Sequence, residues 1–121
     1  MDFIVRVQEL AAKARQMRQA LQGIDTEEAT KNALVMPFIK DVLEYDVFNP
    51  LEVVPEFTAD VGVKKGEKVD YAIIKDGKPV ILFECKRIGT LLEKEQASQL
   101  YRYYTTTEVR FGVLTDGLIY R

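Results

Sequence analysis

Two apolar runs joined by a short turn constrain the fold of this chain more than any other feature. Apolar runs on either side of an Asp-Gly pair predict a β-hairpin. The runs also carry charge, since Asp70 opens one and Glu84 and Lys86 close the other. Glu84 and Lys86 point to one face, because side chains alternate along a strand, and Cys85 points to the other. The runs are residues 69–74 (VDYAII) and 79–86 (PVILFECK), and residues 75–78 (KDGK) join them.

Whether Asp70 lies on the same face as Glu84 depends on the length of the turn. A two-residue loop places Asp70 away from Glu84. A three-residue loop, with Gly77 left-handed and Ile74 paired with Lys78, places the two acids on one face. We predict the three-residue loop and a shared face.

Composition limits the chemistry that is available. The 121 residues are enough for one domain with its own core. The chain has no histidine and one cysteine, which excludes His-based triads, His-ligated zinc and a disulfide framework. Carboxylates, lysines and backbone carbonyls remain, and such oxygen ligands suit Mg²⁺ or Mn²⁺. We expect Cys85 to be a buried, inert residue.

Charge is distributed unevenly along the chain. Residues 1–60 carry 6 basic and 11 acidic side chains, whereas residues 61–121 carry 11 basic and 8 acidic ones. The basic excess therefore lies in the half that holds the hairpin, and Lys64 and Lys65 are candidates to contact phosphate there. A solvated surface is the other interpretation of these charges. No segment is apolar enough to cross a membrane, and the N-terminus does not read as a signal peptide.

The remaining elements predict an α/β (α+β) domain of order α-α-β-β-β-α-β. We expect the last full strand to return parallel to the strand before it, giving a mixed four-stranded sheet flanked by helices. Pro55 marks the first strand as an edge or bulged strand. The sequence stops in a strand pattern, so we expect either a truncated segment or a short last strand. The expected helices are 3–22, about 25–43 (capped by Asp25 with Glu28, kinked at Pro37) and 90–104 (opened by Thr90 and Glu93), and the expected strands are 53–58, 69–74, 79–86 and 109–114.

The charges on the hairpin suggest phosphodiester hydrolysis. Asp70, Glu84 and the backbone carbonyl of Cys85 could bind a divalent metal of the magnesium type. Lys86 would then orient or deprotonate a water and stabilise charge on the attacked phosphate. The alternative for Glu84 and Lys86 is a charge pair at the end of a strand, exposed to solvent.

Four motifs in order resemble the PD-(D/E)xK nuclease superfamily, and more narrowly the N-terminal nuclease domain of type I restriction enzyme R subunits. The resemblance covers about residues 25–121. The motifs are Thr26-Glu27-Glu28-Ala29-Thr30-Lys31 followed by Leu34-Val35-Met36-Pro37, then Asp70, then Glu84-Cys85-Lys86, then Gln99-Leu100-Tyr101-Arg102-Tyr103.

This resemblance implies a restriction endonuclease-like αβββαβ core (residues 25–121) behind an extra N-terminal helix (1–23). It implies a Mg²⁺-dependent DNA endonuclease, with Mn²⁺ as a substitute, in a prokaryotic or phage cytoplasm. Glu27 becomes the helix acid of the site, binding the metal directly or through water, beside Asp70, Glu84 and Lys86. Gln99 and Tyr103 would position DNA or brace the site, or else pack their helix face on the sheet. The family's R subunits continue into helicase domains, but no Walker motif occurs here.

Two other functions stay open at this point. The same fold can serve as a non-catalytic module that binds DNA or protein, and the acidic balance of the chain favours that alternative. The domain could also be the interaction part of a larger regulator that docks through its first helix. The expected partners are DNA, other restriction-system subunits or a missing C-terminal segment, and homo-oligomerisation is a further option.

Overall fold

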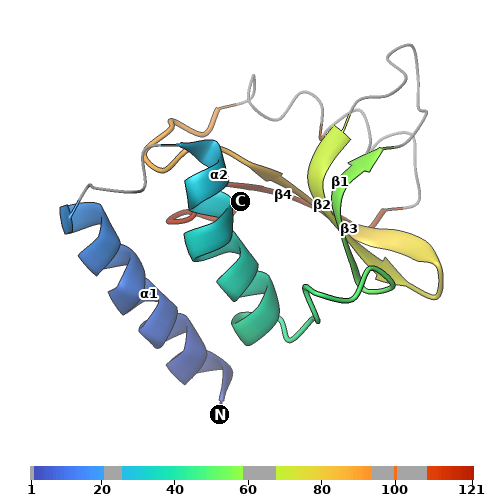
Figure 1. Ribbon diagram of the computed structural model, residues 1–121, viewed down its shortest axis with the longest axis horizontal. Coiled ribbons are helices and arrows are strands. Elements are labelled where there is room, and N and C mark those ends of the chain that lie inside the picture. Colours follow the sequence, from blue (N-terminus) through green and yellow to red (C-terminus); the bar gives the residue numbers. More distant parts are fainter. Residues whose placement is uncertain (1, 21–25, 59–67, 94–99, 101–108) are drawn as a thin grey trace.

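The computed structural model describes residues 2–20, 26–58, 68–93, 100 and 109–121 (Figure 1). Its helices come first and its strands follow. The helical elements are α1 (Phe3–Ala20), α2 (Glu27–Thr30) and the π-helical stretches η1 (Lys31–Val35) and η2 (Phe38–Val42). The strands are β1 (Val53–Thr58), β2 (Lys68–Lys75), β3 (Lys78–Cys85) and β4 (Phe111–Thr115).

The four strands form one mixed sheet of order β1-β2-β3-β4. β1, β2 and β3 are antiparallel neighbours, and β4 returns parallel to β3. The predicted α/β fold class with a mixed four-stranded sheet is therefore confirmed. β1 lies at an edge of the sheet, as Pro55 indicates, because an edge strand can do without one ladder N–H. After β4, the last expected strand is reduced to a single bridge between Thr115 and Tyr120.

The second helical segment packs on one face of the sheet. The chain stays helical from residue 27 to residue 42, with wider turns on both sides of Pro37, whose missing N–H interrupts regular α-helical bonding. Val35 and Ile39 of this segment share a buried cluster with residues of β1, β2 and β3. The sheet residues of that cluster are Val53, Tyr71, Ile73, Phe83 and Cys85.

The opposite face of the sheet is covered by the segment between β3 and β4. Leu92, Leu100 and Val109 of that segment pack against Ala72 and Leu82 of the sheet. The third helix expected at 90–104 lies mostly outside the described residues. Its predicted start is wrong, because residues 91–93 are not helical and the Thr90 hydroxyl donates to the Arg87 carbonyl at 2.6 Å.

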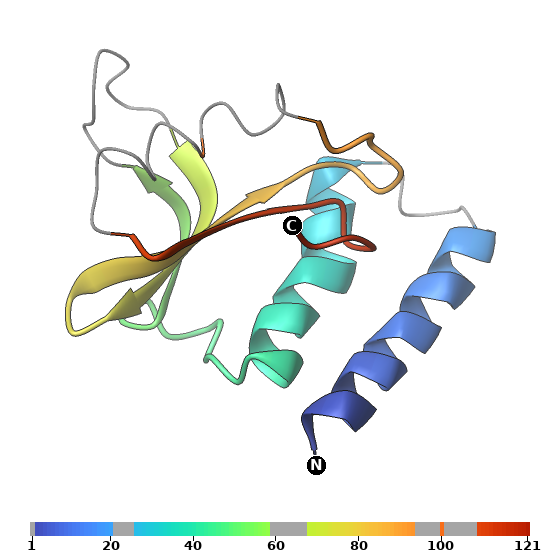
Figure 2. The ribbon, with the colours of Figure 1, turned by 180° about the vertical axis from the view of Figure 1, so that it is seen from behind.

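α1 lies beside η2 rather than on the sheet (Figures 1 and 2). Arg6 joins the two helices through an ion pair with Glu44 at 2.7 Å and a hydrogen bond to the Asp41 carbonyl at 3.0 Å. The first turns of α1 leave Phe3 and Ile4 more than half exposed.

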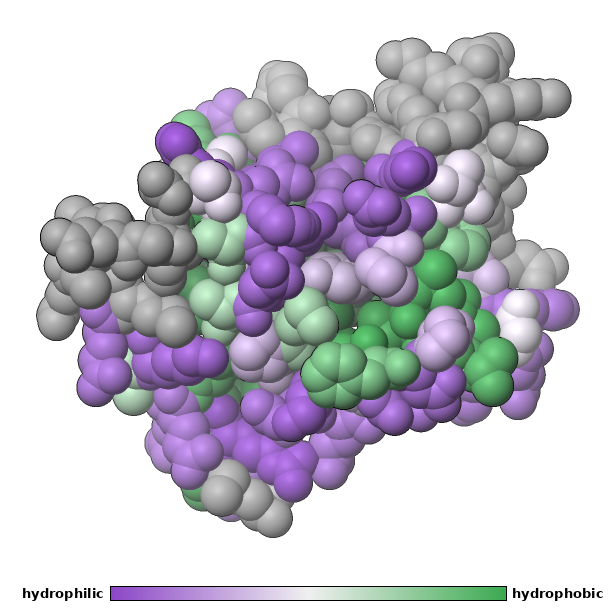
Figure 3. All heavy atoms as spheres, viewed as in Figure 1, coloured by the Kyte–Doolittle hydropathy of each residue, from purple (hydrophilic) through white to green (hydrophobic). Residues whose placement is uncertain are grey.

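Apolar side chains also reach the surface between η2 and β1. On the face in Figure 3 they gather over this connection, whereas hydrophilic and apolar side chains are mixed over the helices. Phe48 and Leu51 of the connection are each 79% exposed. Exposed apolar patches of this kind mark candidate contact surfaces for other proteins.

Two glycines with positive φ offer a matched test of packing after β4. Gly77 (φ 76°) has open space where a side chain would start, whereas a Cβ on Gly117 (φ 88°) would lie 2.9 Å from Leu34 Cδ1 and 3.0 Å from Thr30 Cγ2. We expect Gly77→Ala to lower the free energy of unfolding by about 1 kcal/mol, which is the backbone cost alone. Gly117→Ala should lower it by about 3 kcal/mol, because overpacking is added. Urea denaturation of both variants measures the difference, and equal losses would contradict the tight contact.

Candidate active site

The charged residues of the hairpin meet because β3 contains one extra residue. The turn is a two-residue loop in which Asp76 (φ 52°) and Gly77 (φ 76°) are both left-handed and Lys75 pairs with Lys78. The predicted three-residue loop is therefore wrong. Ile74 pairs with Pro79 but Ile73 pairs with Ile81, so Val80 is a bulge residue.

Because of this bulge, Asp70 and Glu84 lie on the same face of the sheet, where the predicted three-residue loop would also have placed them. Beyond it, Tyr71 pairs with Phe83, and the same register continued by one residue places Asp70 opposite Glu84. Asp70 lies close enough to Glu84 that its carboxyl group raises the pKa of Glu84, both through side-chain hydrogen bonding and through its charge. An extra residue in a strand shifts the register as an extra residue in the loop would, so Asp70 and Glu84 come together by a different route.

Asp70 lies at a bend where the side chains of β2 stop alternating regularly between the two faces of the sheet. Val69 packs with Ala72 on one side of the sheet, whereas Tyr71 and Ile73 pack on the other, so strict alternation breaks at Asp70. On β1, the register pairs Pro55 with Tyr71 and Phe57 with Val69, and Glu56 between them has a φ of 51°. The left-handed residue lets both strands turn together, and Asp70 sits at this bend.

The Asp70 carboxylate takes the place of a backbone partner at the bend. Its Oδ2 atom accepts a hydrogen bond from the Cys85 N–H at 2.7 Å, just beyond the last β2–β3 pair. Its Oδ1 atom lies 3.3 Å from Lys31 Nζ. Asp70 therefore joins β2, β3 and η1. These contacts would stabilise the fold even if Asp70 took no part in catalysis.

Glu84 is a buried acid whose surroundings favour its protonated form when no cation is bound. Its side chain is 6% exposed. Burial, then the hydrogen bond with Asp70 and the charge of that neighbour, together raise the pKa of Glu84 from the ordinary value of 4.5 to about 9, while the charge of Lys86 acts in the opposite direction. Two carboxyl groups this close together make a candidate cation site.

Glu27 lies at the start of α2 and faces the same charges. Burial and then the charge of Asp70 raise its pKa, while Lys86 and Lys31 act in the opposite direction. The predicted cap of this helix is wrong. Thr26 is the N-cap, accepting from the Ala29 N–H at 3.0 Å, and Asp25 lies outside the described residues. Glu28 pairs with Lys31 at 3.0 Å.

Lys31 is a site residue that sequence reasoning did not assign. Its ammonium pairs with Asp70 and Glu28 and lies 5.9 Å from the centre of the Tyr71 ring. Burial lowers the pKa of Lys31, but the hydrogen bonds and charges of Glu28 and Asp70 outweigh burial, and the pKa rises. Lys31 is therefore a permanent cation beside the acids. The sequence did contain one indication of this role. Lys31 lies four residues after Glu27 on one predicted helix, and residues at that spacing share a helix face.

Comparison with protein families identifies the domain. Residues 26–120 match the family model of the type I restriction enzyme R protein N terminus. The chain belongs to this family. No curated protein and no solved structure matches the chain. The matched span contains Glu27, Lys31, Asp70, Glu84 and Lys86, and leaves out α1, so the restriction-family part of the chain begins at the cap of α2.

Several predicted site residues of this R protein N-terminal domain cannot be placed. Gln99, Tyr103, Lys64 and Lys65 lie outside the described residues. Cys85 is fully buried, as expected, and burial raises the pKa of its thiol, which keeps the thiol unreactive.

A magnesium-type ion is compatible with the donors present. Over the described ranges, no group of three or more His, Cys, Asp or Glu side chains is arranged as a metal site. The Asp70–Glu84 pair nevertheless supplies two carboxyl groups with a backbone carbonyl between Glu84 and Lys86. Mg²⁺ commonly takes one or two carboxylates and keeps several waters, so this donor set fits the ion.

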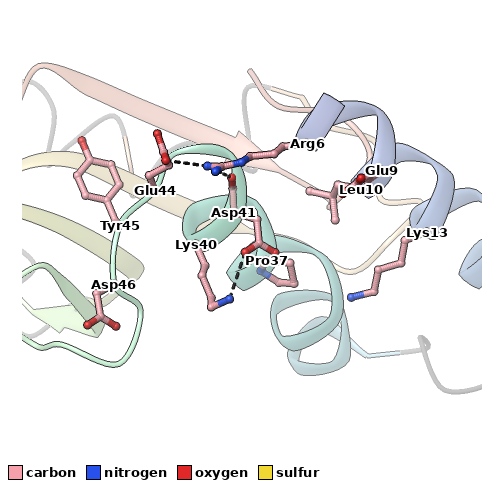
Figure 4. Close-up of a pocket in the computed structure, with 10 residues that line it drawn as sticks. All are labelled: Arg6, Glu9, Leu10, Lys13, Pro37, Lys40, Asp41, Glu44, Tyr45 and Asp46. Carbon is pink, nitrogen blue, oxygen red and sulfur yellow. Dashed lines mark hydrogen bonds and ion pairs between the residues drawn. The ribbon is translucent and has the colours of Figure 1, made fainter. Parts of the chain in front are cut away.

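A separate hollow lies away from the carboxylate site. A hollow of about 760 Å³ separates α1 from η2, and acidic and basic side chains alternate along its walls (Figure 4). Arg6, Glu9 and Lys13 line it from α1, outside the span that matches the family. It shares no lining residue with the carboxylate site. In the part of the chain that the structure describes, no helix has the length and apolarity to cross a membrane.

Proposed function

We propose that this R protein N-terminal domain is a metal-dependent DNA endonuclease that hydrolyses phosphodiester bonds. The observation that carries the proposal is the juxtaposition of Asp70 and Glu84 on neighbouring strands at the bend of the sheet, with Glu27 and Lys86 in the same electrostatic neighbourhood. Membership of the restriction family supports DNA as the substrate and the cytoplasm as the location.

Different residues of the chain would have different roles in the reaction. Asp70, Glu84 and the Cys85 carbonyl would hold Mg²⁺, with Glu27 binding directly or through a water. The bound ion would act as a Lewis acid toward the phosphoryl oxygen. Lys86 would orient the attacking water and stabilise negative charge on the phosphate. Lys31 holds the Asp70 carboxylate in place from the helix side.

A cleavage assay tests this proposal directly. The full chain is incubated with supercoiled plasmid and with single-stranded DNA, in Mg²⁺, in Mn²⁺ and in excess chelator. We expect nicked and linear products in both metals and none in chelator. Absence of cleavage in every condition would overturn the nuclease proposal for this chain.

A protein-binding module is the second candidate, and the exposed apolar surface favours it. Phe48, Leu51 and Leu91 are each more than 70% exposed. Such side chains could contact other restriction-system subunits, a longer C-terminal segment or a second copy of the chain. Sedimentation over a range of concentrations tests the last of these, since self-association makes the measured mass rise with concentration.

A further inference from the structure

The segment that leaves β3 is bonded to three separate elements. It begins with Lys86, whose N–H donates to the Thr115 carbonyl on β4 at 2.8 Å. The Ile88 N–H donates to Thr30 Oγ1 on α2 at 3.0 Å, and the Gly89 N–H donates to Asp116 Oδ2 after β4 at 3.2 Å. Three of the first four amides after the strand are thus anchored, although the segment is irregular.

Thr30 and Asp116 are buried polar residues whose side chains each make more than one hydrogen bond. Thr30 is fully buried, and its hydroxyl donates to the Thr26 carbonyl at 3.1 Å while accepting from Ile88. Asp116 is 3% exposed, and its Oδ1 atom accepts from the N–H groups of Leu118 and Ile119, both at 2.9 Å. Burying polar groups is costly unless their bonds are made, so these two side chains fix the segment firmly.

The two anchors also belong to one packed junction. Gly117, which follows Asp116, has no side chain and lies against Thr30 and Leu34. The same short helix carries Glu27, and Lys31 follows it at the start of η1, so α2, the end of β3 and the turn after β4 are held in a single arrangement. The backbone of Lys86 is fixed relative to Glu27 on the other side of the site.

We propose that Thr30 and Asp116 are positioning residues, which hold the backbone after Lys86 so that its flexible side chain reaches the reacting phosphate. This inference rests on the proposed nuclease function. Neither residue touches substrate. A lysine carries its ammonium on a four-carbon stem, so a shift of its backbone moves the ammonium relative to the reacting phosphate. Misplacement of a reacting group by about 1 Å can lower the rate by about 100-fold.

The chain offers variants that separate positioning from stability. Thr30→Val keeps the shape and removes the hydroxyl, and Thr30→Ser restores the hydroxyl. Asp116→Asn keeps an oxygen for Leu118 and Ile119 and replaces the acceptor of Gly89 by an amide. Thr115→Val is the matched control, because the fully buried Thr115 hydroxyl binds the Gly117 N–H at 2.9 Å and no amide of the 86–89 segment.

The experiment measures kcat, KM and DNA affinity for each variant, with amide hydrogen exchange at Ile88 and Gly89 and the backbone NMR signal of Lys86. We expect Thr30→Val and Asp116→Asn to lower kcat by about 10- to 100-fold with DNA affinity within about twofold. The Ile88 or Gly89 amide should exchange at least about tenfold faster in the matching variant, and the Lys86 signal should shift. Thr30→Ser and Thr115→Val should keep kcat within about threefold of wild type.

Two results would overturn the inference. One is an unchanged kcat in folded Thr30→Val and Asp116→Asn although the wild type cleaves DNA. The other is an unchanged Lys86 signal in both variants, which decides the matter even if the wild type proves inactive. An inactive wild type would refute the proposed function alone, since the exchange and NMR measurements do not depend on turnover.

Discussion

Lys86→Ala should lower DNA cleavage by at least about 100-fold without unfolding the domain. The substitution removes the cation expected to act on the water and the phosphate, and Lys86 is only partly buried, so little packing is lost. Asp70→Asn should lower cleavage as strongly, because it removes a carboxylate from the proposed metal site. Initial rates on supercoiled plasmid in Mg²⁺ measure both effects, with circular dichroism to check folding.

Lys78→Ala is the matched control for these variants. Lys78 is an exposed lysine on the same strand, at the turn end of β3. The Lys78→Ala variant should cleave DNA at a rate within about twofold of that of the wild type. Equal rates in all four samples would point to a contaminating nuclease, and full activity in Lys86→Ala alone would remove Lys86 from the mechanism.

The stability of the metal-free protein should fall as the pH rises from about 5 to 9. The pKa of Glu84 is about 9 in the folded protein and ordinarily 4.5, so the folded state binds this proton more tightly than the unfolded chain does. The stabilisation is complete below pH 4.5 and is lost as the pH climbs toward 9. One such group contributes a slope of at most about 1.4 kcal/mol per pH unit.

Glu84→Gln should flatten that slope, because glutamine has no proton to lose. Chemical denaturation in chelator at pH 5, 6, 7, 8 and 9 gives the free energy of unfolding for both proteins. We expect Glu84→Gln to be the more stable of the two at pH 8. Parallel curves for wild type and Glu84→Gln would show that another group sets the pH dependence.

The hairpin illustrates how far local sequence goes. The apolar runs and the Asp-Gly pair located β2 and β3, and the charges within them located Asp70 and Glu84 near one another. The position of the extra residue could not be predicted, since a longer loop and a bulge at Val80 give the same relation between faces. Asp76 and Gly77 both favour left-handed conformations, and a loop of two such residues suits the twist of the strands.

The helix start and Lys31 were missed for different reasons. Asp25 and Thr26 are neighbouring residues that both suit an N-cap, so the choice depends on which hydroxyl or carboxylate reaches an amide, as Thr26 does. The role of Lys31 depends on Asp70, which lies 39 positions away in the sequence. Such a contact is created by packing of η1 on the sheet and leaves no local pattern.

The bend at Glu56 also affects how the sheet meets other molecules. An edge strand normally offers free N–H and C=O groups to any chain that can align with it. Pro55 has no N–H, and the left-handed Glu56 beside it interrupts the even spacing that an added strand would need. At the other edge, Leu114 exchanges two backbone hydrogen bonds with Arg121, at 2.8 and 2.9 Å. Each border of the sheet thus carries a feature that hinders pairing with an added strand.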